Sequence, residues 1–253
     1  MPDTKQSICL NMIVKDESHV IEKTLKNLCD NIPFSYWVIS DTGSSDNTIE
    51  LIENFFKNKN IPGEIVQHKW KDFSHNRNKA LECAFNKTDY AFIFDADDHI
   101  YGNFTVPEKM VDGAYNLKFG KHGCVYERTL LINNRIPWEY VGVLHEVIIC
   151  KEEGHKISLL DGDYYIESGR LGSRNNDPNK YKKDAKILEN AFYEADKNNE
   201  DIRIRYSFYC AQSYKDCGED EKAIEWYKRR AEYGGWEQEV YFSYYMVGDA
   251  YNR

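Results

Sequence analysis

The sequence has no apolar run that approaches the roughly 20 residues needed to span a bilayer. Its first residues, MPDTKQSICLNMIVKDE, lack the extended apolar segment of a secretory signal. No block of basic residues is present, and the formal net charge is −9. These features argue against general attraction to nucleic acid or to anionic membranes. We therefore expect a cytoplasmic protein with no membrane span and no nucleic-acid partner.

The seven cysteines are odd in number, scattered, and contain no CxxC pair. Such a set argues against a disulfide framework and against a zinc site. Free cysteine usually behaves as a small hydrophobic residue, so we expect most of these side chains to be buried. Since 42% of the 253 residues are hydrophobic, the chain can bury a sizeable core. This composition favours one large domain plus an appendage.

Strand-like and helix-like patterns alternate over the first hundred residues. The strand patterns cover residues 7–14, 36–41, 64–68 and 90–95. Helical patterns separate them, and the third helix is predicted to begin with Ser74 as its N-cap residue. Strand, helix and strand at this spacing require right-handed crossovers. The pattern therefore predicts a mostly parallel sheet flanked by helices.

A continuous helical pattern rich in Tyr, Ala, Glu and Lys follows residue 177. In its first helix, Ile187, Ala191 and Ala195 are predicted to share one buried stripe. Further on, Gly218 is placed at a turn between two helices whose small and aromatic positions match a tetratricopeptide helix pair. Those positions are Ala211, Tyr214, Ala223 and Tyr227. The alternative is an amphipathic bundle without a partner role.

We expect two domains, residues 1–175 and 176–253. Stacked helix pairs need neighbours to bury their faces. The helical part is therefore expected to continue in a longer natural chain, or to pack its last helix on the sheet domain or on a second copy of the chain. The last of these alternatives predicts a homodimer through the helical domain.

Three polar clusters follow strands of the predicted sheet: KDE after the first, SDTGSSDNT after the second and DADD after the fourth. In open parallel sheets, ligands bind outside the carboxyl ends of the strands. Three clusters at the same edge therefore predict a binding site.

In the DADD cluster, Asp95, Asp97 and Asp98 repel one another unless they are protonated or neutralised. A hard divalent cation such as Mg²⁺ or Mn²⁺ resolves this repulsion and keeps open positions for substrate oxygens. A cation that brings in a diphosphate also explains how a protein of net charge −9 can hold an anion. The alternative is a solvated acidic turn.

Asp41 ends the second strand pattern, where a carboxylate can accept hydrogen bonds from a ribose or a base edge. Asp46 is expected to cap the following helix through the backbone amides of Asn47 and Thr48. The alternative for this segment is an ordinary turn followed by a helix cap.

Four segments, SICLNMIVKDE, VISDTGSSDNT, FSHNRNKAL and FIFDADD, occur in an order that resembles the family 2 glycosyltransferases. These are inverting nucleotide-sugar enzymes with the GT-A fold. The later LLINNRIPWEYVGVLHE and GRLGSRNNDPNKYKKDAKILENA resemble a subgroup that carries tetratricopeptide-like helices. The resemblance implies an α/β fold, with a GT-A (Rossmann-like) sheet followed by a helical domain. It also implies metal-dependent hexosyl transfer from a UDP-sugar to an acceptor hydroxyl, with inversion.

The resemblance also implies roles for individual residues. Asp41 and the backbone from Val14 to Glu17 are expected to hold the uridine, and Arg77 to approach the nucleotide or diphosphate. Asp95 is expected near the ribose.

By the same resemblance, Asp97 is the metal ligand for Mn²⁺ or Mg²⁺. Asp98 departs from the commonest family pattern and is a candidate catalytic residue that acts on the metal or the sugar.

Inversion needs a base that takes the proton of the acceptor, and Glu146 is our first choice. The alternatives are Asp161, Asp163 and Glu167. His145 is expected to ligate the metal or to contact the donor. If GVLHE is extended, His145 and Glu146 point to opposite faces.

Arg170 and Arg174 bracket a glycine-containing loop that is expected to close over the diphosphate; the alternative is a basic linker facing solvent. Trp138 and Trp70 are candidates for stacking on a sugar or acceptor, although buried aromatic residues are more often core.

Two other functions compete with the transferase. One is an inactive scaffold whose helices bind a protein partner. The other is a nucleotidyltransferase, which is disfavoured because no glycine-rich loop with a basic residue follows the first strand. The helical appendage suggests, by analogy, a protein or peptide acceptor. The sugar depends on hydrogen bonds that residue spacing does not reveal.

Overall fold

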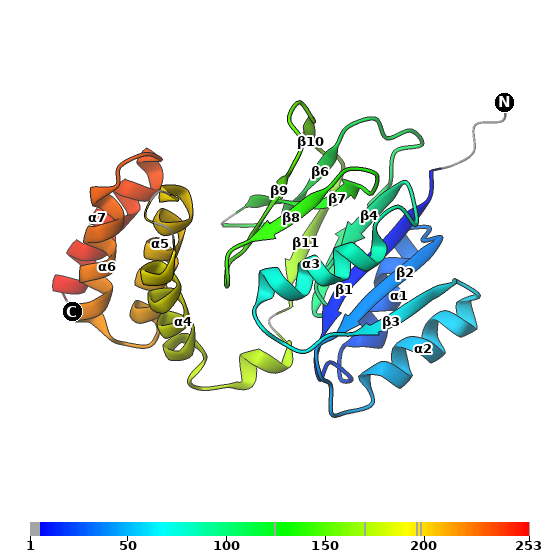
Figure 1. Ribbon diagram of the computed structural model, residues 1–253, viewed down its shortest axis with the longest axis horizontal. Helices are drawn as coiled ribbons and strands as arrows, with labels where there is room; N and C mark the ends of the chain where they lie inside the picture. Colours follow the sequence, from blue (N-terminus) through cyan, green and yellow to red (C-terminus); the bar gives the residue numbers. More distant parts are fainter. Residues whose placement is uncertain (1–5, 124, 170, 196, 198, 253) are drawn as a thin grey trace. The chain divides into compact units, whose positions relative to one another are not determined.

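The structure is a computed structural model that describes residues 6–123, 125–169, 171–195, 197 and 199–252. It divides into two compact units, which are described separately (Figure 1). The first contains Met1–Tyr140 and Ile148–Asn176, and the second contains Val141–Val147 and Asp177–Arg253. The domain boundary expected at residues 175 and 176 stays a prediction. Residues 141–147, which were expected in the first domain, group with the second unit.

A nine-stranded sheet forms the first unit, with the strand order β3-β2-β1-β4-β7-β6-β11-β5 and with β10 paired to β6. The strands are β1 (Ile8–Val14), β2 (Tyr36–Asp41), β3 (Gly63–Gln67), β4 (Tyr90–Ile93), β5 (Asp98–Gly102), β6 (Ala114–Phe119), β7 (Tyr126–Asn133), β10 (Ile157–Leu159) and β11 (Tyr164–Ser168). β1 to β4 run parallel, while β7 lies antiparallel between β4 and β6. The sheet is mostly parallel, as predicted. β8 (Trp138–Val141) and β9 (Val147–Cys150) form a separate pair.

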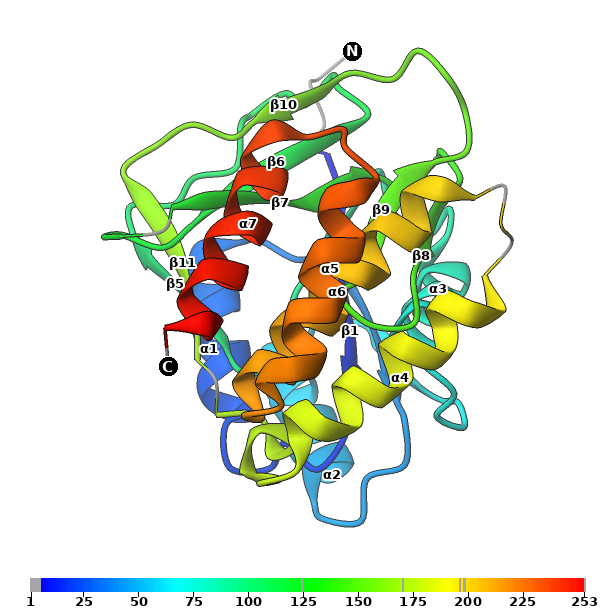
Figure 2. The same ribbon diagram turned by 90° about the vertical axis from the view of Figure 1, so that its left-hand side faces the viewer.

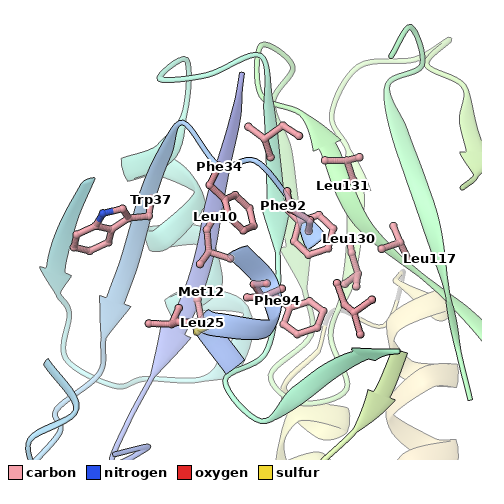
Figure 3. Packing of buried hydrophobic residues seen from close by; sticks show 14 of the residues in the cluster. Leu10, Met12, Leu25, Phe34, Trp37, Phe92, Phe94, Leu117, Leu130 and Leu131 are labelled. Carbon is pink, nitrogen blue, oxygen red and sulfur yellow. The ribbon is translucent and has the colours of Figure 1, made fainter. Parts of the chain in front are cut away.

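Helices cover both faces of the parallel strands. Two of them, α1 (Ile21–Asn31) and α2 (Thr48–Lys59), contribute to the larger hydrophobic core. Leu10 and Met12 of β1 belong to this core together with Leu25 of α1 (Figure 3). On the other face, the Asn11 amide donates a hydrogen bond of 2.9 Å to a backbone carbonyl of α3 (Phe73–Ala84). The alternation along β1 thus decides which helix each residue meets.

The N-cap of α3 differs from the predicted one. Its first helical residue is Phe73, and Asp72 is the cap, since the Asp72 carboxylate accepts a hydrogen bond of 2.7 Å from the backbone amide of His75. Ser74, the predicted cap, lies inside the first turn and donates its hydroxyl to Asp72. The prediction was wrong because the Asp72 carboxylate accepts the backbone amide of His75 and so starts the helix one residue before Ser74.

The described part of the second unit contains four helices, each packed on its neighbour along the chain (Figure 2). They are α4 (Lys180–Glu194), α5 (Glu200–Asp216), α6 (Asp220–Glu232) and α7 (Glu237–Tyr251). The four residues expected at small and aromatic positions of a helix pair are buried, and Gly218 has φ of +80° at the turn. The tetratricopeptide assignment itself stays a proposal.

Two positions of the predicted stripe on α4 are wrong. Ala195 is only half-buried and follows the last helical residue, Glu194. Ile187 is 44% exposed, whereas Ala185, Leu188 and Phe192 are buried. The helix is rotated so that its larger apolar residues, rather than Ile187, face α5 and α6.

Two further features concern only the described residues. None of their helices combines the length and apolarity needed to cross a membrane. Their six cysteines are free thiols; only Cys9 and Cys210 are buried and the other four are half-buried, so the expectation that most are buried was wrong for these residues.

Replacement of Gly63 by alanine is predicted to destabilise the sheet. A Cβ at this position lies 2.3 Å from ring atoms of Trp37, and Trp37 is stacked on Phe56 with ring centroids 4.6 Å apart. The ring has to move, so Gly63→Ala is expected to lose about 1–3 kcal/mol in urea unfolding. Gly248→Ala is the control: a Cβ there meets nothing within 4 Å, and alanine inside a helix gains about 0.5–1 kcal/mol. An equal change in unfolding free energy for the two substitutions would contradict the close contact between residue 63 and the Trp37 ring.

Candidate functional site

The loops that follow β1 and β2 are joined by hydrogen bonds into one platform. Residues 16–18 and 44–48 are joined by five of them: the Ser45 hydroxyl donates to Asp16 Oδ1 at 3.0 Å, and four backbone amides donate to side-chain oxygens. The four amide hydrogen bonds are Asp16 N to Ser44 Oγ (2.9 Å), Glu17 N to Thr48 Oγ1 (2.8 Å), Ser18 N to Asp46 Oδ2 (3.1 Å) and Ser45 N to Asp16 Oδ1 (2.6 Å). Asp16 has φ of +54°, a conformation that aspartate tolerates better than most residues. The sequence patterns of the two loops did not reveal this connection.

Asp41 shapes the turn after β2. Its carboxylate is 2% exposed and accepts the backbone amides of Gly43 and Ser44 at 3.0 and 3.1 Å. These bonds match the ordinary-turn alternative, and a contact with ribose stays a prediction. The carbonyl of Val14 is likewise used within the platform, because it accepts the Thr42 amide at 2.9 Å.

Asp46 accepts the Thr48 amide at 3.0 Å, as predicted, but the N-cap residue of α2 is Asn47, and the other Asp46 oxygen takes the Ser18 amide instead of that of Asn47. Although burial raises the pKa of Asp46, the hydrogen bonds from Ser18 and Thr48 outweigh it and lower the pKa to about 2.

The Asp95 carboxylate is held between two guanidinium groups. Arg77 of α3 donates from Nη2 to Asp95 Oδ1 at 2.6 Å, and Arg128 of β7 donates from Nη1 and Nη2 to Oδ2 at 3.3 and 3.2 Å. Burial opposes ionisation, but the two arginines together hold the pKa of Asp95 well below its usual range. Charge-assisted hydrogen bonds of this kind are stronger and more directional than neutral ones. Asp95 is therefore a fixed anion at the end of β4.

Arg128 was not predicted as a site residue. β7 pairs antiparallel with β4, with Phe92 opposite Leu131. Asp95 follows Phe92 by three residues and Arg128 precedes Leu131 by three, so the antiparallel register brings them to the same end of the pair. The sequence feature that could have indicated it is an arginine two residues before the apolar run LLI, in a segment that forms a strand. Its meaning depends on β7 lying next to β4, which the residues alone do not indicate.

Asp98 is 2% exposed at the start of β5. Its Oδ2 lies 3.6 Å from Arg128 Nη1, while its Oδ1 is buried and has no hydrogen-bond partner within the described residues. Burial first, and then the neighbouring Asp95 charge, raise the pKa of Asp98 to about 7 against the opposing effect of Arg128. Asp95 and Asp98 thus experience opposite electrostatic environments.

A glycine-containing segment lies against Asp97. The backbone amide of Gly172 donates to Asp97 Oδ2 at 2.8 Å. A Cβ on Gly172 would lie 3.2 Å from that oxygen and 3.3 Å from Glu17 Oε1, so the Asp97 and Glu17 carboxylates flank the same glycine. A Cβ on Gly169 would lie 1.9 Å from the Asp97 carbonyl oxygen. Glycine is therefore required where this segment passes Asp97.

Arg174 and Trp70 both contact Phe73 at the start of α3. The Arg174 guanidinium lies 5.0 Å from the Phe73 ring centroid, and Trp70 packs edge-on against the same ring at 4.8 Å. Trp70 remains 40% exposed. Arg170, the other arginine of the predicted loop, lies outside the described residues.

Trp138 is buried, and its indole nitrogen donates to the carbonyl of Asn133 at 3.2 Å. It belongs to a core cluster with Leu81 and Ile132 and also lines a groove of about 490 Å³ beside α3. Its burial matches the core alternative given for aromatic residues.

His145 and Glu146 group with the second unit. The His145 ring stacks on Tyr209 of α5 with centroids 4.0 Å apart, and its carbonyl accepts a hydrogen bond from Arg205. His145 has φ of +53°, and the segment between β8 and β9 is not a strand. The opposite-face argument for an extended GVLHE therefore does not apply, and the roles of both residues stay predictions.

The alternative bases lie along β11 and before it. β11 pairs antiparallel with β5, with Ser168 opposite Asp98 and Tyr164 opposite Gly102. Asp161 and Asp163 precede Tyr164, so they lie beyond the end of β5 that is farther from Asp98. Glu167 is adjacent to Ser168 in the strand and therefore points to the other face of the sheet.

No group of three or more His, Cys, Asp or Glu side chains in the described ranges is arranged to hold a metal ion by itself.

Sequence comparison with protein families locates a match in this part of the chain. Residues 9–116 match the model of glycosyl transferase family 2. The matched segment is less than half of the chain, but it contains Asp41, Arg77, Asp95 and Asp97. No curated protein sequence matches the chain.

Solved structures show the fold. Staphylococcus aureus TarS matches with a TM-score of 0.50 and 13% identity, over 97% of this chain and 54% of that chain. TarS 1–349 in complex with UDP-GlcNAc has a TM-score of 0.46 and 12% identity, over 97% and 89% of the two chains. The mannosyltransferase PcManGT from Pyrobaculum calidifontis, in complex with GDP-Man and Mn²⁺, has a TM-score of 0.34 and 20% identity, over 38% and 29%. The expected fold class, a GT-A sheet followed by helices, is confirmed. The match spans about half of the longer TarS chain and less than a third of the PcManGT chain.

The raised pKa of Asp98 predicts a pH-dependent stability. The pKa moves from 3.8 to about 7 on folding, so between these values the folded state binds more protons than the unfolded state. Asp98 therefore lowers stability as the pH rises through this window, by at most about 1.4 kcal/mol per pH unit. Asp98→Asn removes this contribution, and its stability relative to the wild type is expected to increase between about pH 5 and about pH 7.5. Urea unfolding in EDTA measures the difference; a difference that does not change with pH would contradict the assignment.

Proposed function

We propose that the chain is a metal-dependent glycosyltransferase that moves a hexose from a UDP-sugar to an acceptor hydroxyl with inversion. The observation that carries this proposal is the arrangement at the end of β4, where Asp95 is fixed by two arginines and Asp97 stands two residues later. The family match over residues 9–116 supports the reaction class. The choice of uridine rests on the sequence resemblance.

The donor set near Asp97 fits a hard cation such as Mn²⁺ or Mg²⁺. Asp97 supplies carboxylate oxygens, the Glu17 carboxylate lies at the same glycine, and Asp98 has a buried oxygen without a partner within the described residues. Mg²⁺ commonly takes one or two protein carboxylates and completes its shell with phosphate oxygens and waters. A protein cluster of three ligands is therefore not required. When bound, the cation stabilises negative charge on the departing diphosphate.

The side chains have separate tasks in this proposal. Asp41 and the platform built on Val14 and Glu17 hold the nucleoside. Arg77 binds close to the diphosphate while it keeps Asp95 ionised next to the ribose, and Arg174 covers the diphosphate.

Glu146 is proposed to take the proton from the acceptor hydroxyl, and His145 to assist at the metal or the donor. Asp98 acts on the sugar or the metal. Trp70, exposed beside Phe73, is the stronger of the two tryptophan candidates for contact with a sugar, because Trp138 is buried.

The four helices of the second unit are proposed to act as tetratricopeptide-like repeats that bind a protein or peptide acceptor. The support is the burial of the repeat's small and aromatic positions and the glycine turn between α5 and α6.

Asp97→Ala is predicted to abolish metal-dependent nucleotide binding. Calorimetry with UDP and Mn²⁺ is expected to show binding to the wild type that EDTA eliminates, and no such binding to the variant, because the substitution removes the carboxylate nearest the proposed cation. Thermal unfolding in EDTA checks that both proteins are folded. Asp30→Ala is the matched control, since Asp30 is an exposed carboxylate paired with Lys26 on α1. Mn²⁺-dependent binding to Asp97→Ala at wild-type affinity would overturn the site assignment.

Glu146→Gln is predicted to slow turnover while UDP and Mn²⁺ still bind. Loss of a general base typically costs about 10²–10⁴ in rate, and a screen of UDP-sugars for slow hydrolysis supplies the assay. Glu139→Gln, which alters an exposed carboxylate paired with Lys151, serves as the control. A wild-type rate for Glu146→Gln would move the base to Asp161, Asp163 or Glu167.

A further inference from the structure

Arg128 contacts two of the three carboxylates at the end of β4. Its Nη1 and Nη2 lie 3.3 and 3.2 Å from Asp95 Oδ2, and Nη1 lies 3.6 Å from Asp98 Oδ2. Asp97 lies between these two aspartates in the sequence. A single guanidinium therefore spans the turn from which Asp97 projects.

The turn is also closed by its own backbone, since the Asp98 amide donates to the Asp95 carbonyl at 3.3 Å. Arg77 holds the other oxygen of Asp95 from α3. With three carboxylates and two guanidinium groups, the local formal charge is reduced from −3 to −1 when all groups are ionised. Removal of Arg128 leaves −2 and deprives the buried Asp98 of its nearest cation.

The position of Arg128 is itself well determined. It stands on β7, where it pairs with Leu117 of β6, three residues before the segment that pairs with β4. Its guanidinium lies 4.9 Å from the Phe119 ring centroid, a distance at which a cation is attracted to an aromatic face. The guanidinium is thus held against a buried ring while its nitrogens face the aspartates.

We propose that Arg128 is a positioning residue of the metal site: it ties Asp95 to Asp98 and so fixes the turn that presents the Asp97 carboxylate to the cation. This inference rests on the proposed function, because it assigns a partner to the proposed metal ligand. Arg128 acts through the aspartates and does not itself ligate the metal. Groups that orient metal ligands typically change metal affinity by 10- to 100-fold when they are replaced.

A purely structural ion pair would behave differently. Its loss lowers the melting temperature, and nucleotide binding in the folded protein keeps its dependence on Mn²⁺. A positioning role instead predicts a loss of Mn²⁺ affinity in a variant that remains folded. The two roles are separated by a binding measurement rather than by activity.

The test compares Mn²⁺ affinity in the presence of saturating UDP, measured by calorimetry or electron paramagnetic resonance, for the full chain and three variants. Arg128→Gln removes the positive charge. Arg128→Lys keeps the charge but cannot donate from two guanidinium nitrogens at once. Arg135→Gln is the control, since Arg135 forms an exposed ion pair with Asp89 at the start of β4, the opposite end from Asp95. Melting temperatures in EDTA are measured in parallel.

Arg128→Gln is expected to bind Mn²⁺ about 10- to 100-fold more weakly than the wild type, Arg128→Lys to lose a smaller factor, and Arg135→Gln to match the wild type. If Arg128→Gln does not fold, the Mn²⁺ affinity of Arg128→Lys tests the positioning role instead. Wild-type Mn²⁺ affinity in a folded Arg128→Gln, or in Arg128→Lys when Gln does not fold, would overturn the positioning role. If the wild type itself binds no Mn²⁺ with UDP, the proposed function fails first, and the positioning role fails with it.

Discussion

The Asp95 carboxylate is fixed from two sides by Arg77 and Arg128, and the rest of the candidate site depends on this arrangement. Three aspartates within four residues repel one another. Two guanidinium groups offset most of that charge, and they come from different elements, α3 and β7. The neutralisation therefore requires the helix and the inserted strand to be packed correctly on β4. The charge cluster at the strand end becomes stable only in the folded sheet.

A second constraint joins the loops after β1 and β2. Hydrogen bonds between residues 16–18 and 44–48 satisfy backbone amides that face the edge of the sheet. Asp41 accepts two amides of its own turn. A surface built from such bonds is rigid before any ligand binds, which lowers the entropy cost of binding. The platform and the aspartate cluster follow neighbouring strands, because β1 lies between β2 and β4.

Much of the sheet was predictable because each strand from β1 to β4 is a short apolar run separated by a helical pattern. The acidic cluster after β4 was predictable for the same reason. Arg128 was not, because its partner depends on a strand about thirty residues later being inserted antiparallel next to β4. The cap of α3 was misplaced from Asp72 to Ser74 because both residues can accept an amide, and only the backbone conformation decides between them.

The central claim is that a cation binds at Asp97 together with the diphosphate of a nucleotide, beside an Asp95 that the arginines keep in place. Anomalous diffraction at the manganese edge, from crystals grown with UDP and Mn²⁺, tests it most directly. The account predicts a manganese peak in contact with the Asp97 carboxylate and the diphosphate, with Arg77 and Arg128 still bonded to Asp95. Bound UDP without manganese at Asp97, or a nucleotide-free strand edge, would contradict it.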